Sequence, residues 1–314
     1  MRSYTLIAPA KINLYLEIIG DRPDGYHELA MILQSIELAD QIELEANDIQ
    51  LIRLKCDSKQ VPVDRSNLAY RAADLMVEEF PDSFATYGGV DITLHKRIPV
   101  AAGLAGGSTD AAAVLVGMDL LWKLGLTKSE LEELSAKLGS DVPFCIGGGT
   151  AIATRRGEVL SPISGLQDIY IVLAKYRSLE VSTPWAYKSY RSLYGGSYIQ
   201  DKESLTTRGS AVHSGEIVKA ISHQDVKEIA EKMHNDLEKV VLPEYPQVLK
   251  LKESFAKYDI LGTMMSGSGP SVFALCESKE KAEEVKINLR NEIPDDDLEL
   301  FVTKLINHGI QVVN

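Results

Sequence analysis

The sequence is poor in cysteine, and the three cysteines that it contains are far apart. Cys56, Cys145 and Cys276 form no C-x-x-C pair. This spacing excludes a disulfide framework, a zinc ribbon and a dithiol redox pair. Reduced, buried thiols are expected instead, as in a cytoplasmic protein.

Long apolar runs are also missing. No stretch approaches the roughly 20 apolar residues that a membrane-spanning helix needs. The apolar residues before Lys11 are too few for the hydrophobic core of a signal peptide. We therefore expect a cytoplasmic protein that has no membrane partner.

Basic residues are outnumbered by acidic ones. The chain has 33 Lys and Arg against 45 Asp and Glu, a formal net charge of −12, and no cluster of basic residues. This balance argues against nucleic acid and anionic lipid as partners. A phosphorylated ligand would have to be held locally, by backbone N–H groups, helix termini and a few cations.

The length and composition are those of a folded chain of roughly two domains. The 314 residues are 45% apolar and 25% charged. The polar segment Ser161–Gly165 predicts a boundary that gives domains 1–165 and 166–314. The second half alternates strands with helices on a short antiparallel sheet, which is typical of an α+β domain.

Hydrophobic periodicity predicts the elements of both halves. In the first half, strands are expected at 12–18, 35–46, 49–56, 90–94 and 150–160, with helices at 68–80, 114–122 and 128–138. A capping box, Thr127–Glu130, begins the last of these helices. The second half is predicted to have strands at 169–174, 271–275 and 298–305, helices at 184–194, 215–221, 225–240, 246–258 and 278–293, and an exposed loop at 195–214.

The segment from Lys96 to Ala113 is the most informative part of the sequence. A loop of small residues follows a predicted strand and leads directly into a helix. Consecutive N–H groups in such a loop form a nest for a phosphate. The alternative is a tight turn in which Ser108 or Thr109 only caps the helix. The common P-loop, dinucleotide-binding and protein-kinase motifs are absent.

A second small-residue loop, Ser266–Ser271, precedes a predicted strand. By itself it is more typical of a turn between strands. Two such loops in one chain could hold two phosphorylated groups from opposite domains, as a phosphoryl transferase requires.

Two charged residues could form an acid–base pair. Lys11 lies in a largely apolar strand, and Asp141 lies in a short turn before a glycine run. Lys11 could also be a strand-end lysine that reaches water. Asp141 could cap the following turn. Tyr26 and His27, after the Asp24-Gly25 turn, could stack on a ligand base or be ordinary surface residues.

Together these segments resemble the GHMP kinases. Their three motifs are similar to Pro9–Leu14, Pro99–Ala111 and Met265–Ser271, in the same order along the chain. The segment Arg22–Glu28 resembles the members of the family that phosphorylate a cytidine-diphosphate-linked methylerythritol. Gly139–Phe144 and Asn235–Glu238 are similar to further landmarks of those members.

The resemblance implies an α+β, two-domain GHMP kinase fold with the active site between the domains. Its N-terminal domain would be a β-rich α/β domain that binds ATP, and its C-terminal domain would be ferredoxin-like. The implied reaction is transfer of the ATP γ-phosphate to the 2-hydroxyl of the cytidine-diphosphate-linked methylerythritol, a step of non-mevalonate isoprenoid synthesis. ATP and Mg²⁺ are the implied cofactors, and the resemblance leaves monomer and homodimer open.

The same resemblance implies roles for particular residues. Asp141 would take the proton of the hydroxyl, and Lys11 would keep that carboxylate ionised and orient the acceptor. The implied ATP-binding residues are Lys96, Pro99, Val100, Ala101, Ala102, Gly103, Leu104, Ala105, Gly106, Gly107, Ser108 and Thr109. The implied substrate-binding residues are Asn13, Tyr26, His27, Tyr187, Ser266, Gly267 and Gly269, with Trp185 as the alternative to Tyr187. No residue is assigned to the metal.

Two positions depart from the family pattern. Asp110 stands where asparagine is frequent, and Ala105 stands where many members have glycine. Two other functions are compatible with the motifs: a related kinase that acts on homoserine or mevalonate, and an inactive nucleotide-binding regulator with the same fold.

Overall fold

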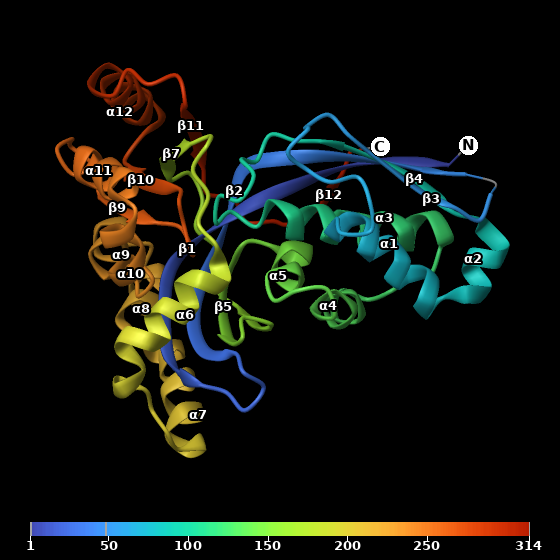
Figure 1. The fold of residues 1–314 in the computed structure, drawn as a ribbon, viewed down its shortest axis with the longest axis horizontal. Helices are drawn as coiled ribbons and strands as arrows, with labels where there is room; N and C mark the ends of the chain where they lie inside the picture. Colours follow the sequence, from blue (N-terminus) through green and yellow to red (C-terminus); the bar gives the residue numbers. More distant parts are fainter. Residues whose placement is uncertain (1, 48, 314) are drawn as a thin grey trace.

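A long antiparallel hairpin organises the first half of the chain. The computed structural model describes residues 2–47 and 49–313 (Figure 1). In it, β1 (Ser3–Asp21) pairs with β2 (His27–Ala46) along nearly their whole length, from Ser3 opposite Glu45 to Asp21 opposite His27. Gly25 closes the connecting turn with a φ of 84°, a value that glycine adopts without strain.

Further strands extend this hairpin into the first sheet. In order they are β3 (Ile52–Cys56), β4 (Val90–His95), β5 (Thr150–Arg155) and β6 (Val159–Pro162). β4 and β5 both pair with β2, β3 lies beyond β4, and β6 lies beyond β5. Two short strands of the second half, β8 (His234–Asn235) and β12 (Gln311–Val312), pair with β1.

Helices of the first half cover one face of this sheet (Figure 1). They are α1 (Leu68–Glu79), α2 (Pro81–Tyr87), α3 (Gly106–Trp122), α4 (Lys128–Ala136) and α5 (Val142–Gly147). Residues 111–115 of α3 are fully buried, as expected for a helix that is apolar on almost all sides. Strand β4 alternates between buried and half-buried residues, whereas the middle of β1, from Ala8 to Leu14, is buried throughout.

The second half forms a four-stranded antiparallel sheet in the order β11-β7-β10-β9. Its strands are β7 (Tyr170–Tyr176), β9 (Gly262–Met265), β10 (Val272–Cys276) and β11 (Leu298–Lys304). Its helices are α6 (Thr183–Tyr194), α7 (Lys202–Ala211), α8 (Glu216–Ser222), α9 (Val226–Lys232), α10 (Glu238–Glu244), α11 (Pro246–Phe255) and α12 (Lys279–Glu292). Figure 1 shows this half standing beside the end of the β1–β2 hairpin.

The predicted α+β fold class is confirmed, and so is the capping box, in which Thr127 and Glu130 bond each other's backbone N–H groups. Two element predictions are wrong. The expected loop at 195–214 contains α7, which Asp201 caps and whose Arg208 pairs with Glu17 of β1 at 2.7 Å. The polar composition of α7 concealed a helix that packs against the hairpin.

The helix predicted at 225–240 is interrupted by β8. The Asp236 carboxylate accepts a hydrogen bond from the Ile18 N–H at 2.8 Å, and the Asp236 N–H donates to the Leu16 carbonyl at 2.9 Å. These bonds to β1 outweigh the local helical pattern. The division into 1–165 and 166–314 stays a prediction. Within the described residues, no helix is long and apolar enough to cross a membrane.

Candidate active site

Two irregularities in the β1–β2 pairing aim polar side chains out of an apolar strand. The register shifts between Pro9 and Lys11, and again between Asn13 and Tyr15. Such bulges re-aim the side chains beside them. Lys11 and Asn13 therefore line a cavity, while Ile12 between them is fully buried in the core.

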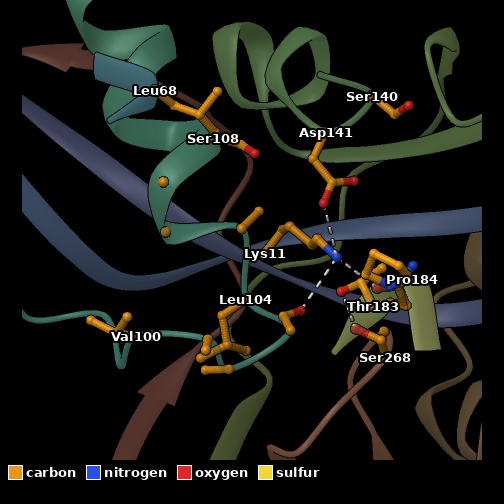
Figure 2. Close-up of a pocket in the computed structure, with 18 of the residues that line it drawn as sticks. Lys11, Leu68, Val100, Leu104, Ser108, Ser140, Asp141, Thr183, Pro184 and Ser268 are labelled. Atoms are coloured by element: carbon orange, nitrogen blue, oxygen red, sulfur yellow. Dashed lines mark hydrogen bonds and ion pairs between the residues drawn. The ribbon is translucent and has the colours of Figure 1, made fainter. Parts of the chain in front are cut away.

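The Lys11 ammonium lies at the centre of this cavity (Figure 2). It donates to Asn13 Oδ1 at 2.9 Å and to the Gly103 carbonyl at 3.3 Å. It also lies 3.6 Å from Asp141 Oδ2. A buried ammonium needs such partners. The lysine is therefore not a strand-end residue that reaches into water.

Asp141 occupies the N-cap position of α5 but makes no capping hydrogen bond with its side chain. Its side chain is 35% exposed and points toward Lys11 (Figure 2). The Asp141 side chain therefore does not cap α5. A carboxylate that an adjacent cation holds, and that faces an open cavity, can accept a proton from a bound hydroxyl.

Residues 96–105, here called the cradle loop, connect β4 to α3. Every second residue from Ala101 to Ala105 has a left-handed backbone conformation, with φ values of 50° at Ala101, 74° at Gly103 and 59° at Ala105. Ala105 thus takes the backbone conformation that the usual glycine would take. No side chain caps α3, so the N–H groups of its first turn are left for an anion.

The predicted ATP-binding residues lie together around this turn. Lys96 and residues 99–108 all line the cavity, while Thr109 is fully buried and does not. The cap alternative for Ser108 and Thr109 is excluded, because both lie inside the helix and Ala105 occupies the cap position.

The second small-residue loop, Ser266–Ser271, packs against the cradle loop at Gly103. We call it the support loop. The Ser266 hydroxyl donates to the Gly103 carbonyl at 3.1 Å. A Cβ atom on Gly103 would lie 2.3 Å from the Ser266 carbonyl oxygen, so only glycine allows this approach. Gly267 and Ser268 line the cavity, whereas Ser266 and Gly269 do not.

An aromatic group forms the other end of the cavity. The His27 and Tyr187 rings lie 5.2 Å apart at 31°, and Tyr198 meets His27 edge-on. Tyr26 is 54% exposed, and the Arg156 guanidinium lies over its ring, 4.9 Å from the centroid of that ring. Trp185 packs against Tyr245 instead. Of the two aromatic residues left open, the structure therefore brings Tyr187 to the cavity.

His27 is poised to bind a neutral polar group. Burial and the nearby Arg191 guanidinium lower the pKa of His27 to about 4. Its ring is therefore uncharged near neutral pH. Among the described residues, the buried Nε2 atom has no hydrogen-bond partner, and the Asp21 carboxylate lies 3.7 Å from it. A buried ring nitrogen without a partner in a cavity wall is suited to a ligand.

The cavity has a volume of about 1020 Å³ and draws its walls from both halves of the chain. Five basic and two acidic side chains line it: Lys11, Lys96, Arg156, Lys188 and Arg191, with Asp110 and Asp141. The local balance is thus opposite to the net charge of −12. Lys11 and Lys96 are paired with the two carboxylates of this lining, so the excess positive charge that faces an anionic ligand comes from Arg156, Lys188 and Arg191.

Sequence reasoning missed one wall of the cavity. Gln60, Val61, Pro62, Ser66, Asn67 and Leu68 line it beside the cradle loop. Asn67 caps α1 by accepting from the Ala69 N–H at 2.8 Å and also donates to the Pro62 carbonyl at 2.7 Å. The only signal in the sequence was this helix cap, which indicates a turn and not a ligand.

Comparisons with known proteins agree on one relationship. The family models "GHMP kinases N terminal domain" and "GHMP kinases C terminal" match residues 67–149 and 217–295. The chain is 70% identical to the 4-diphosphocytidyl-2-C-methyl-D-erythritol kinase of Nostoc punctiforme, with 100% of this chain and 99% of that protein covered. It is 56% identical to the kinase of the same name from a Synechocystis strain, with both chains fully covered.

Solved structures show the same fold. A crystal structure of 4-(cytidine 5'-diphospho)-2C-methyl-D-erythritol kinase is 31% identical, with a TM-score of 0.75 over 97% of this chain and 100% of that chain. A homoserine kinase from Cytophaga hutchinsonii has a TM-score of 0.73 at 18% identity over 100% and 98% of the two chains. The second likeness shows the fold alone.

Proposed function

The chain belongs to the 4-diphosphocytidyl-2-C-methyl-D-erythritol kinases, ATP-dependent small-molecule kinases of the GHMP family, and we propose that it phosphorylates the 2-hydroxyl of 4-diphosphocytidyl-2-C-methyl-D-erythritol. The observation that carries this proposal is the position of Lys11 and Asp141. Lys11 Nζ lies 3.6 Å from Asp141 Oδ2, in a cavity lined by the cradle loop and by the aromatic residues Tyr26 and Tyr187. The step belongs to the non-mevalonate route to isoprenoid precursors.

ATP binds along the cradle loop and the start of α3. Main-chain N–H groups of residues 103–108 face its phosphates, and residues 60–68 form the wall beside its nucleoside. Small residues let the phosphates approach the backbone. The described residues hold no group of three or more His, Cys, Asp or Glu side chains that could cage a metal. Magnesium bound to the phosphates of ATP would lower the charge of the triphosphate.

Asp141 and Lys11 act on the acceptor hydroxyl. As that oxygen attacks the γ-phosphorus, its proton passes to Asp141 and the bond between the γ-phosphorus and the β–γ bridging oxygen breaks, which releases ADP. Lys11, whose ammonium lies 3.6 Å from Asp141 Oδ2, holds the carboxylate in place and orients the hydroxyl. Phosphoryl transfer depends mainly on such positioning.

The aromatic end of the cavity holds the cytidine part. Tyr26 and Tyr187 offer ring faces to the base, and the neutral His27 offers its unpartnered Nε2. Asn13 and Gly267 lie nearer to Lys11, where the diphosphate and the sugar alcohol would pass. Ser266 and Gly269 contribute by shaping the support loop behind Gly267.

The test is a direct assay of the full-length protein with ATP and the proposed acceptor. Phosphorus NMR should show one new phosphomonoester on the 2-hydroxyl carbon, and methylerythritol without the cytidine group should give no product. Transfer to homoserine or mevalonate would instead support a related kinase. ATP binding without transfer to any acceptor would support an inactive regulator.

A further inference from the structure

Lys96, which begins the cradle loop and lines the cavity, is bonded to two carboxylates. Its side chain is 6% exposed and its ammonium donates to Asp40 and, at 2.6 Å, to Asp110 Oδ2. Two of its three N–H groups are thus committed to carboxylates. A phosphate of the nucleotide would have to compete with both carboxylates for the Lys96 ammonium.

Asp40 fixes this lysine to the first sheet. It is fully buried on β2, and its second oxygen accepts from the N–H groups of Arg97 at 2.5 Å and Ile98 at 2.8 Å. The same carboxylate therefore holds the lysine and the backbone that follows it. Three nitrogen atoms at the start of the cradle loop, those of the Lys96 ammonium and of the Arg97 and Ile98 backbone, are thus bonded to Asp40.

Asp110 connects the lysine to α3. It lies in the first helical turns, is 2% exposed and lines the cavity. Its Oδ2 is bonded to Lys96, whereas its buried Oδ1 has no hydrogen-bond partner among the described residues. Without Lys96, the carboxyl groups of Asp40 and Asp110 would be buried without a cation between them, with Asp110 in the cavity wall, which is strongly unfavourable.

We propose that Lys96 is a positioning residue that holds the cradle loop and α3 against β2 and shields ATP from Asp40 and Asp110, and that it does not itself bind the phosphates. The inference rests on the proposed placement of ATP along the cradle loop. It predicts that losing Lys96 costs much less once the carboxylate of Asp110 has been removed, and that the bond to Asp40 accounts for the loss that remains.

A double-mutant cycle on the full-length enzyme tests this. Lys96→Gln should raise the KM for ATP by at least about tenfold, because a buried carboxylate loses its partner beside the anion. Asp110→Asn should change it by less than about threefold in the wild type. Asp110→Asn in the Lys96→Gln background should recover most of the loss. If Lys96 instead bound ATP directly, Asp110→Asn would change the KM by the same factor in both backgrounds, and that result overturns the proposal.

Two further readouts separate positioning from general instability. The KM for the cytidine-linked acceptor should stay within about threefold in Lys96→Gln, because the acceptor binds at the other end of the cavity. A variant that only unfolds in part would lose kcat at unchanged KM for ATP, which contradicts the proposal. Lys137→Gln, which breaks an exposed pair with Glu79, is the control for losing a lysine of the same half.

If Lys96→Gln is too unstable to purify, the double variant Lys96→Gln/Asp110→Asn tests the proposal by itself. We expect Lys96→Gln/Asp110→Asn to fold, with a KM for ATP within about tenfold of the wild type. A folded double variant that has lost ATP binding overturns the proposal. Failure of the proposed function would show differently, as absence of product from the wild-type enzyme in the same assay.

Discussion

The two ends of the cavity are built from different parts of the polypeptide. The proposed nucleotide end is lined by residues 60–62, 66–68, 96 and 98–108; its loop offers backbone and small side chains, and its one lysine is bonded to buried carboxylates. The acceptor end consists of large side chains on turns and on α6, among them Tyr26, Arg156 and Tyr187. Backbone amides suit a triphosphate, which any kinase of this fold must hold, whereas side chains can change with the acceptor.

This division gives the two ends separate kinetic signatures. A variant at the nucleotide end should therefore change the KM for ATP alone. A variant at the acceptor end should change the KM for the acceptor alone, and a variant where the ends meet should change kcat.

The largest effect is expected where the two ends meet. Asp141→Asn keeps the size of the side chain but removes the base, so kcat should fall by at least about 100-fold while both KM values stay within about threefold. Steady-state kinetics with each substrate varied in turn measures this. Asp82→Asn, on the exposed helix α2, is the control. Near-wild-type kcat in Asp141→Asn would reject the assignment of the base.

The second effect tests the nucleotide end through its backbone. Gly103→Ala places a Cβ atom 2.3 Å from the Ser266 carbonyl oxygen, so the cradle loop must move away from the support loop. A shift of about 1 Å is enough to raise the KM for ATP by about 30-fold or more. The KM for the acceptor should change far less.

Gly125→Ala is the matched control for that change. Gly125 has nearly the same φ, 71° against 74°, but a Cβ atom there would meet no atom within 4 Å. Both variants should lose about 1 kcal/mol of unfolding free energy to backbone strain. An equal rise in the KM for ATP in both would mean that strain, and not contact between the two loops, controls the nucleotide end.

The small-residue loop was easier to predict from sequence than the rest of the cavity. Its residues are contiguous, so a loop leading into a helix at 99–108 could be found by pattern, and the structure places these residues in the cavity wall. Their binding of ATP stays a prediction. The partners of Lys96 could not be found by pattern, because Asp40 lies 56 residues away and only the sheet brings it near. The bulges beside Lys11 and Asn13 left no pattern either, since the middle of β1 is buried on both faces.

The acceptor end depends on contacts that are distant in sequence. Tyr26, Arg156 and Tyr187 come from three separate segments, and only the resemblance to a family connected the first with the last. Arg156 was missed because an arginine in a polar turn is ordinary. Tertiary bonds likewise decided the region around Asp236, where hydrogen bonds to β1 replaced the helix that the local pattern predicted.

The third effect tests stacking at the acceptor end. Tyr26→Ala should raise the KM for the cytidine-linked acceptor by about tenfold, the usual size of a lost contact between a base and an aromatic ring. The KM for ATP should not change. Tyr26→Phe keeps the ring face and should behave like the wild type. If Tyr26→Phe were as impaired as Tyr26→Ala, the hydroxyl and not the ring would be the binding group.

The smallest effect concerns Arg156, whose guanidinium lies over the Tyr26 ring. A cation at such an exposed ring contributes about 1 kcal/mol. Arg156→Gln should therefore raise the KM for the acceptor by about fivefold. Arg155→Gln removes the same charge from the neighbouring exposed residue, which does not line the cavity, and should have no effect. If Arg156 acts by holding Tyr26, Arg156→Gln should change little in the Tyr26→Ala background; a full fivefold loss there would show that Arg156 contacts the acceptor itself.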